Sequence, residues 1–398
     1  MKCLKKINLA KDKNKVIYFA FCAYLVLQLL AITSLFFGND IFELVLKICR
    51  YMCYGVFTFE ILIDRQKISK IELCLILLGI LIWGFSKNRS ILITLLIIIS
   101  LKKLEFNKLL KLSCNVLAIS FSIIVVASLL KIIPDWVYMR GSIARHSLGF
   151  LYPTDCSSIF LMITLLLLYN NSSDIPFYQI GVLEIINILL FIYTNGRLSF
   201  ILINLVLLIM LMLKIKVFSK YLFKKELIKK MKIVGYIIPV FFLILTNILI
   251  FLIPTNNSIV NKLDLVLSHR ISYAEKAYQK YGLHLFGKKI EWHGWGGYSY
   301  VDNKKSFEYN FVDNSYAKVL LDYGIVFTIV VIYAYVKMLL YCCDKKDMVL
   351  YITLIIVLMW SFVEPYIISV SRNIYTISFI LLLKENPKNS RWLCEKVN

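Results

Sequence analysis

Three arginines in polar segments between apolar stretches are the residues best suited to chemistry. Arg197 ends a short Thr-Asn-Gly-Arg turn, Arg145 comes directly before His146, and Arg270 lies in a long polar segment. A guanidinium stays charged, and its fork of N–H donors matches phosphate oxygens. Several arginines at one level would bind a diphosphate and stabilise it as a leaving group. Each could instead be a cation that extends toward lipid headgroups.

Acidic residues in apolar surroundings are the second group of interest. Four of them lie inside or at the ends of apolar segments: Asp155, Glu184, Asp322 and Glu364. Such carboxylates are costly and usually face a cavity. Glu364 could accept a proton from a hydroxyl group. The alternative is an ion pair between Glu364 and either Arg372 or Lys318.

The sequence Asp313-Asn314-Ser315-Tyr316 precedes an apolar segment and has two interpretations. Asp, Asn and Ser are common N-cap residues, so the segment could simply begin a helix. Alternatively, Asp313 acts as a base, and Asn314 and Tyr316 bind a sugar.

The charged residues Glu43, Lys47 and Arg50 are spaced four and three apart. This spacing places them on one face of a helix. We expect a structural stripe of ion pairs there.

The composition indicates a membrane protein. Of the 398 residues, 60% are hydrophobic, compared with about 45–50% in an ordinary soluble domain. The apolar residues come in runs of roughly 20, the length that crosses a bilayer core. The net charge of +22 resides mostly in short loops, which argues against a nucleic-acid surface. No cysteine spacing resembles a zinc site, and we expect neither metal nor cofactor.

The runs predict an all-α polytopic membrane protein that is a single transmembrane domain, residues 1–398, with about twelve spans. The predicted spans are 16–37, 41–63, 71–86, 90–101, 113–133, 149–169, 177–194, 198–213, 233–253, 317–341, 348–367 and 374–384. Three of them are short, so the number could be eleven to thirteen.

Basic residues orient the predicted spans. With the N-terminus inside, the inner segments are 1–15, 64–70, 102–111, 170–176, 214–232, 342–347 and 384–398, and the short outer loops are 38–40, 87–89, 134–148, 195–197 and 368–373. The inner segments hold 27 Lys and Arg residues and the short outer loops hold 6. Because positive loops stay in the cytoplasm, both termini are predicted to be cytoplasmic.

One large outer loop, residues 254–316, is then the only soluble segment of any size. Over 263–286 apolar residues recur every three or four positions, which predicts one amphipathic helix carrying Arg270. The stretch 292–316 is rich in aromatic residues and Gly. It could stack on sugar rings or form a small packed lid.

Four motifs in this order resemble bacterial polysaccharide polymerases of the Wzy type and the related O-antigen ligases. They are RHSLGFLYPTD (Arg145–Asp155), YTNGRLSF (Tyr193–Phe200), HRISYAEKAYQKYGLHLFG (His269–Gly287) and VDNSYAKVLLDYG (Val312–Gly324). The large outer loop after the ninth span is also similar. The resemblance covers most of the chain by topology and only these four stretches by motif.

The resemblance implies a C-type glycosyltransferase-like membrane fold and a metal-independent, inverting transfer. The donor would be a glycan on undecaprenyl diphosphate, and the acceptor would be the non-reducing end of another lipid-linked repeat unit. Arg197 matches the family's arginine at the short outer turn, and Arg270 matches the arginine that opens the loop helix. Asp313 stands where many ligases carry a His, which favours a polymerase.

The expected site therefore combines these residues. Catalytic roles are expected for Arg197, Glu364 and Asp313, and substrate or diphosphate binding for Arg145, His146, Arg270, Arg372, Tyr316 and Asn314. The chain would act at the extracellular face of a bacterial plasma membrane, in capsule or exopolysaccharide synthesis. A flippase and a chain-length regulator of the same pathway are possible partners. The alternatives are a lipid-linked oligosaccharide flippase or other transporter, and an O-antigen-type ligase.

Overall fold

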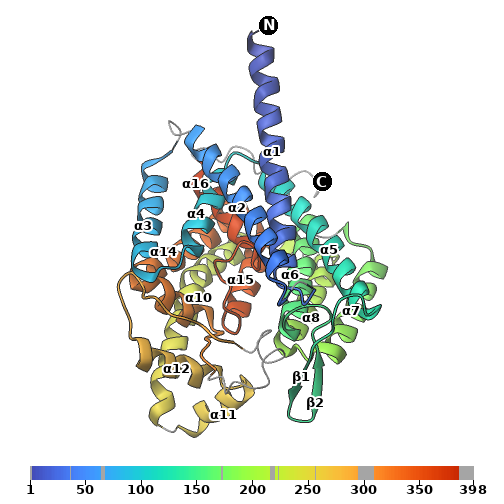
Figure 1. Cartoon of the computed structure of the whole chain (residues 1–398), viewed down its shortest axis with the longest axis vertical. Helices are drawn as coiled ribbons and strands as arrows, with labels where there is room; N and C mark the ends of the chain where they lie inside the picture. The colour runs from blue at the N-terminus through green and yellow to red at the C-terminus, as the bar shows by residue number, and fades with distance from the viewer. Residues whose placement is uncertain are drawn as a thin grey trace.

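A computed structural model of the chain describes residues 2–35, 37–63, 68–171, 174–215, 220–222, 224–255, 257–294 and 309–384, with side chains from Asn14 onward. Almost all of this part is helical (Figure 1). The long elements are α1 (Lys2–Leu30), α2 (Asp40–Ile63), α3 (Lys70–Ser86), α4 (Ser90–Leu101), α5 (Phe106–Leu129), α6 (Pro153–Asn171), α7 (Phe177–Thr194), α8 (Arg197–Leu213), α10 (Lys225–Leu252), α14 (Ser315–Lys345) and α15 (Met348–Ser361). The short ones are β1 (Val137–Arg140), β2 (Ile143–His146), η3 (Ile253–Thr255), α11 (Ser258–Val266), α12 (Arg270–Tyr281), η4 (Ile374–Phe379) and α16 (Ile380–Leu383).

Five helices of the described part are long and apolar enough to cross a membrane: α5, α6, α7, α10 (with η3) and α14. Shorter apolar helices are residues 14–30 of α1, α4, α8, α15 and the η4–α16 pair. Each predicted span overlaps a helix. The expectation of an all-α membrane protein is therefore confirmed, whereas the number of twelve spans stays a prediction.

The centre of the bundle is α6. Thirteen of its 19 residues are buried, because it is apolar on all sides and packs against α5, α7, α8 and α15. By contrast, α5 buries Leu117, Phe121 and Ile124 on one face and exposes Ile119 and Ile123 on the other, as a helix at the edge of a bundle does.

One end of the bundle carries β1, β2, α11 and α12, opposite the N-terminus of α1 (Figure 1). We call it the loop end. The β1–β2 hairpin was not expected from the sequence. It turns at Gly141, whose φ of 59° lies in the left-handed region.

The single helix predicted over 263–286 is wrong, because the chain forms two helices, α11 and α12. Ser268 and His269 between them have φ angles of 58° and 63°, which interrupt the helix although the apolar spacing continues. The carboxylate of Asp264 accepts hydrogen bonds from the backbone N–H groups of Ile271 (2.9 Å) and Ser272 (3.1 Å). Of the aromatic stretch, residues 295–308 lie outside the described residues.

A break in α14 anchors the segment after α12. Gly324 has φ 85° and ψ 175°, and the freed N–H groups of Ile325 and Val326 bond to the carbonyls of His284 (3.0 Å) and Leu285 (3.2 Å). A Cβ on Gly324 would lie 2.4 Å from the backbone nitrogen of Gly287. Only glycine allows this close approach of the loop to the helix.

Candidate functional site

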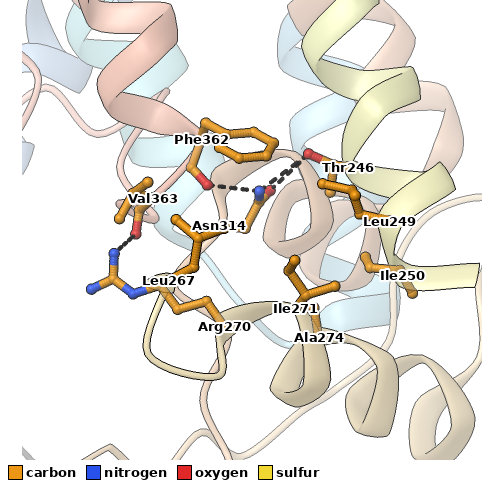
Figure 2. Close-up of a pocket in the computed structure, with 10 residues that line it drawn as sticks. All are labelled: Thr246, Leu249, Ile250, Leu267, Arg270, Ile271, Ala274, Asn314, Phe362 and Val363. Carbon is orange, nitrogen blue, oxygen red and sulfur yellow. Dashed lines mark hydrogen bonds between the residues drawn. The ribbon is translucent and has the colours of Figure 1, made fainter. Parts of the chain in front are cut away.

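Arg270, the first residue of α12, lies between two carboxylates. Its Nε is 3.3 Å from an oxygen of Asp313, and its Nη2 is 3.7 Å from an oxygen of Glu364. Its Nη1 donates to the carbonyl of Val363 (Figure 2). Burial alone would lower the pKa of Arg270, but Asp313 and Glu364 raise it overall. Arg270 therefore stays a charged, fully engaged cation.

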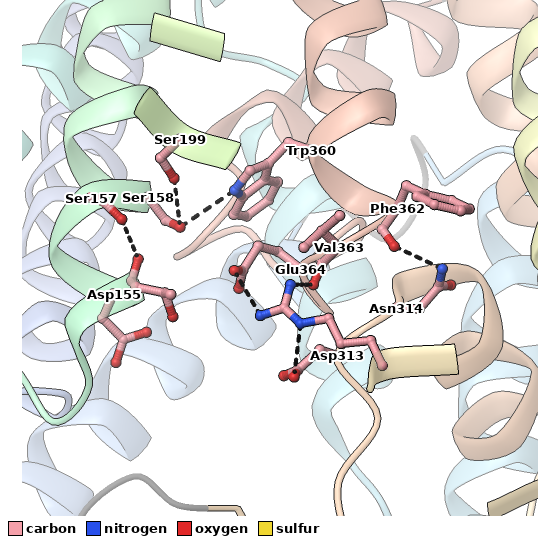
Figure 3. A network of polar contacts seen from close by, with 12 residues as sticks. Asp155, Ser157, Ser158, Ser199, Asp313, Asn314, Trp360, Phe362, Val363 and Glu364 are labelled. Carbon is pink, nitrogen blue, oxygen red and sulfur yellow. Dashed lines mark hydrogen bonds and ion pairs between the residues drawn. The ribbon is translucent and has the colours of Figure 1, made fainter. Parts of the chain in front are cut away.

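The start of α14 fixes the position of these carboxylates. Asn314 caps α14: its Oδ1 accepts from the N–H groups of Tyr316 (2.9 Å) and Ala317 (3.0 Å). Its Nδ2 donates to the carbonyl of Phe362 at 2.8 Å (Figures 2 and 3). The cap thus places Asp313 beside the connection that carries Glu364, because one amide bonds both segments.

Two residues expected to bind substrate have structural contacts instead. The amide of Asn314 is used by the cap and by Phe362. Tyr316 is only 2% exposed, and its hydroxyl donates to the carbonyl of Leu358 at 3.0 Å. The helix-cap interpretation of this motif is therefore the one that the described contacts support.

Glu364 has the surroundings of a proton acceptor. Helix α15 ends at Ser361, so Glu364 lies in the connection beyond the helix and not inside a span over 348–367. Burial, together with the charges of Asp313 and Asp155, raises its pKa to about 8, although Arg270 opposes this. Its ion-pair partner is Arg270, neither Arg372 nor Lys318. A carboxyl with a pKa near the working pH suits general acid–base catalysis.

Arg372 forms a separate, partly buried ion pair. Its Nη1 donates to Asp155 of α6 at 2.8 Å, and its guanidinium lies 4.9 Å from the ring centroid of Tyr366. In Figure 3, Asp155 lies at the start of α6, on the side of that helix where Glu364 lies. Arg372 thus attaches the chain after α15 to α6 and has its charge balanced.

Arg145 on β2 is buried without such a balance. It is 2% exposed, its Nε donates to the carbonyl of Thr194 at 2.8 Å, and its Nη2 has no hydrogen-bond partner. Its guanidinium lies 5.5 Å from the ring centroid of Tyr152. Burial lowers its pKa overall, Tyr152 opposes this through its charge and a side-chain hydrogen bond, and the charges of Arg270 and Glu364 also act on it. Arg145 is therefore close enough to Arg270 and Glu364 for their charges to influence its ionisation.

Arg140 and Arg197 add positive charge around Arg145. Burial and the charges of Arg145, Arg197 and Arg270 lower the pKa of Arg140 to about 10. Within the described part of the chain, none of Arg140, Arg145 and Arg197 pairs with a carboxylate. We call these three the unpaired arginines. Positive charge concentrated in this way attracts an anion.

The turn that carries Arg197 is built for close packing. Gly196 faces α6, where a Cβ would lie 2.4 Å from the hydroxyl oxygen of Ser157, so no larger residue fits. Asn195 caps α7 with a φ of 49°. Arg197 begins α8, is exposed, and its Nε is 3.3 Å from the side-chain oxygen of Asn195. The turn holds Arg197 at the loop end and supplies the carbonyl that orients Arg145.

His146 points to a neighbouring loop. Its Nδ1 lies 2.6 Å from an oxygen of Asp135, whose second oxygen accepts from the N–H of Leu148 at 2.8 Å. This contact braces the hairpin, and the expected binding role of His146 stays a prediction. Sequence reasoning missed Arg140, Asp135 and Tyr152; the signal for Arg140 was its place five residues before Arg145 around a Gly-Ser turn.

A small cavity beside Arg270 is not a substrate site. It encloses about 10 Å³ (Figure 2), which holds one water molecule at most. Its lining is mainly apolar, from α10 and α12. It is a gap between packed helices.

Among the described residues, no group of three or more His, Cys, Asp or Glu side chains is placed to hold a metal ion. Comparison of the chain with protein-family models, curated proteins and solved structures finds no match.

Proposed function

We propose that this chain is a membrane glycosyltransferase that polymerises lipid-linked repeat units. The donor is a growing glycan on a polyprenyl diphosphate such as undecaprenyl diphosphate. One observation carries the proposal: Arg145 is buried with an unbonded guanidinium nitrogen, within the electrostatic range of Arg140, Arg270 and the carboxyl of Glu364, whose pKa is about 8. Glycosyl transfer from a diphosphate needs a site that binds the anionic diphosphate and, next to it, a group that accepts the proton of the acceptor hydroxyl.

In the proposed reaction, the unpaired arginines bind the diphosphate of the donor. The acceptor hydroxyl gives its proton to Glu364, and its oxygen attacks the anomeric carbon. The bond from that carbon to the diphosphate oxygen breaks, and the bonding pair leaves with the lipid diphosphate. The arginines lower the barrier because they stabilise the charge that develops on this leaving group. Attack from the opposite side inverts the anomeric centre.

Arg270 also contributes to this site, through its two carboxylate partners. It is the only described cation in contact with both Asp313 and Glu364, so it reduces the repulsion between these carboxylates and a bound diphosphate. The proposal places the loop end at the extracellular face of a bacterial plasma membrane, both termini in the cytoplasm, and twelve spans between them. Its pathway partners would be a flippase and a chain-length regulator.

The test is the lipid-linked material that accumulates in living cells. In a deletion strain complemented with Arg145→Gln or Arg197→Ala, we expect polymer to be lost and single lipid-linked units to accumulate on the outer face. Arg89→Gln is the matched control, because Arg89 is an exposed arginine over the ring of Tyr51. Units that accumulate inside would make the chain a flippase. Long polymer that is made but not attached would make it a ligase.

A second test concerns the ion requirement. We expect transfer by the purified chain in detergent to survive a strong chelator, because arginines supply the positive charge at the diphosphate. Loss of activity that only a divalent ion restores would contradict this part of the proposal.

A further inference from the structure

A second cavity lies at the loop end, away from Arg270. It encloses about 440 Å³ between the end of α1, the start of α2 and Leu151. This is the size of an ordinary ligand pocket. Its polar lining comes mainly from one face of α2: Asp40, Glu43, Lys47 and Arg50.

These charged residues do not form the ion-pair stripe that their spacing predicts. Glu43, Lys47 and Arg50 do share a helix face, but no ion pair links them among the described residues. The carboxylates of Asp40 and Glu43 and the ammonium of Lys47 have no hydrogen-bond partner there, and Arg50 donates only from Nε to the carbonyl of Leu46 at 3.3 Å. The cavity therefore presents free acceptors and free donors.

The mixture of charges limits what the cavity can bind. An anion such as a lipid phosphate would meet Lys47 and Arg50 but would be repelled by Asp40 and Glu43. A sugar has hydroxyl groups that both donate and accept hydrogen bonds, so it can use the carboxylates and the cations together. The apolar side chains of Leu30 and Leu44 in the lining suit the C–H faces of its rings.

The cavity borders the unpaired arginines. The N–H of Leu151 donates to the carbonyl of Ile32 at 2.8 Å, and Thr33 pairs with Phe150. The next residue, Tyr152, has its ring against the guanidinium of Arg145. Leu151 thus lines the cavity, and the residue after it contacts an unpaired arginine.

We infer that this cavity binds one or two sugar rings of the acceptor glycan, an inference that rests on the proposed function. Transfer needs two glycans at once. The unpaired arginines recognise the diphosphate of one, and the cavity recognises hydroxyl groups of the other.

The test is a binding measurement on the full chain in detergent, without donor. The probe is the labelled oligosaccharide that mild acid releases from the lipid-linked units of cells lacking the chain. We expect it to bind the wild type, and to bind Glu43→Gln and Lys47→Gln at least about ten-fold more weakly, because each loses a charge-assisted hydrogen bond. Ala31→Phe, which places a ring in the cavity, should weaken binding as well.

Two controls make the result specific. Lys262→Gln changes an exposed lysine of α11 outside the cavity and should bind the oligosaccharide as the wild type does, as should Arg89→Gln, which changes an exposed arginine outside the cavity. Thermal unfolding confirms that each variant folds. No binding, or equal binding by the wild type and the cavity variants, overturns the inference. A chain that binds the oligosaccharide in the cavity but transfers nothing contradicts the proposed function alone.

Discussion

Arg145, which is buried, and Arg270, which is mostly buried, both lie at the loop end, but their surroundings differ. Arg270 contacts two carboxylates and a carbonyl. Arg145 contacts a carbonyl and an aromatic ring, and the charged side chains that lower or raise its pKa include Arg270 and Glu364 at longer range. The charge of Arg270 is balanced by carboxylates of the chain, whereas the charge of Arg145 is not.

The difference separates a structural role from a binding role. Removing a cation from water costs several kcal/mol, which nearby carboxylates and hydrogen bonds can offset. For Arg270 the described contacts supply this offset. For Arg145 they supply only part of it, so an anion from outside the chain would complete it. The comparison predicts that the two arginines respond oppositely to the same substitution.

The largest effect is expected on folding, from Arg270→Gln. Above pH 8, where Glu364 is ionised, this change leaves the buried Glu364 and the partly buried Asp313 without their cation, which should lower the free energy of unfolding by about 3–5 kcal/mol. Unfolding of the purified chain measures it. Adding Glu364→Gln and Asp313→Asn should recover most of the loss. If the triple variant is no more stable than the single one, the ion pairs are not what stabilises this region.

The next effect is on activity, from Arg145→Gln. We expect transfer to fall about 100-fold or more, because one donor to the developing charge is lost, while the free energy of unfolding stays equal or rises. The rate of transfer from a lipid-linked donor tests the expected loss of activity, and unfolding curves test the expected stability. A variant as unstable as Arg270→Gln would show that Arg145 is structural, and the comparison would fail.

How far the sequence predicts this site depends on the range of the interactions. The Thr194–Arg197 turn was predicted, because short turns with Gly and Asn are local. A helix cap in the Asp313–Tyr316 motif was one of two interpretations for the same reason, and Asn314 is the residue that forms it. The pairing of Arg270 with Glu364 was not, because it joins the start of α12 to the connection after α15, 94 positions apart in the chain.

The same limit explains the errors in the fold. The apolar spacing over 263–286 continues through the break between α11 and α12, so periodicity could not show where Asp264 would cap a new helix. The absence of ion pairs along α2 was also hidden, because side chains at helical spacing can pair or can face a cavity. Helical spacing shows that residues share one face of a helix, but it does not show whether that face packs against another element, lines a cavity or faces solvent.

A moderate effect is expected from pH. With a pKa of about 8, Glu364 is protonated in most molecules at pH 7, so transfer should rise with pH to a plateau above 8. Asp313→Asn removes a charge that raises this pKa, so the midpoint should move to lower pH, and Glu364→Gln should abolish the rise. A pH–rate profile that is the same in all three chains would exclude Glu364 as the base.

The ionisation of Glu364 also affects stability, with a definite sign. Its folded pKa of about 8 lies above the ordinary value of 4.5, so the folded chain holds this proton more tightly than the unfolded chain does. The resulting stabilisation is complete below pH 4.5 and is lost as the pH rises through 8. In Glu364→Gln this part of the pH dependence should be missing from the unfolding curves.

The smallest effect is expected at His146, which lies next to Arg145 in the chain but contacts Asp135. The side chains of this pair are about a third exposed, and such pairs contribute less than about 1 kcal/mol. His146→Gln should therefore change stability by less than that and transfer by no more than about three-fold, compared with about 100-fold or more for Arg145→Gln. A large loss of transfer in His146→Gln with normal folding would restore His146 as a substrate-binding residue. It would also show that the binding region extends beyond the unpaired arginines to the Asp135 side of the hairpin.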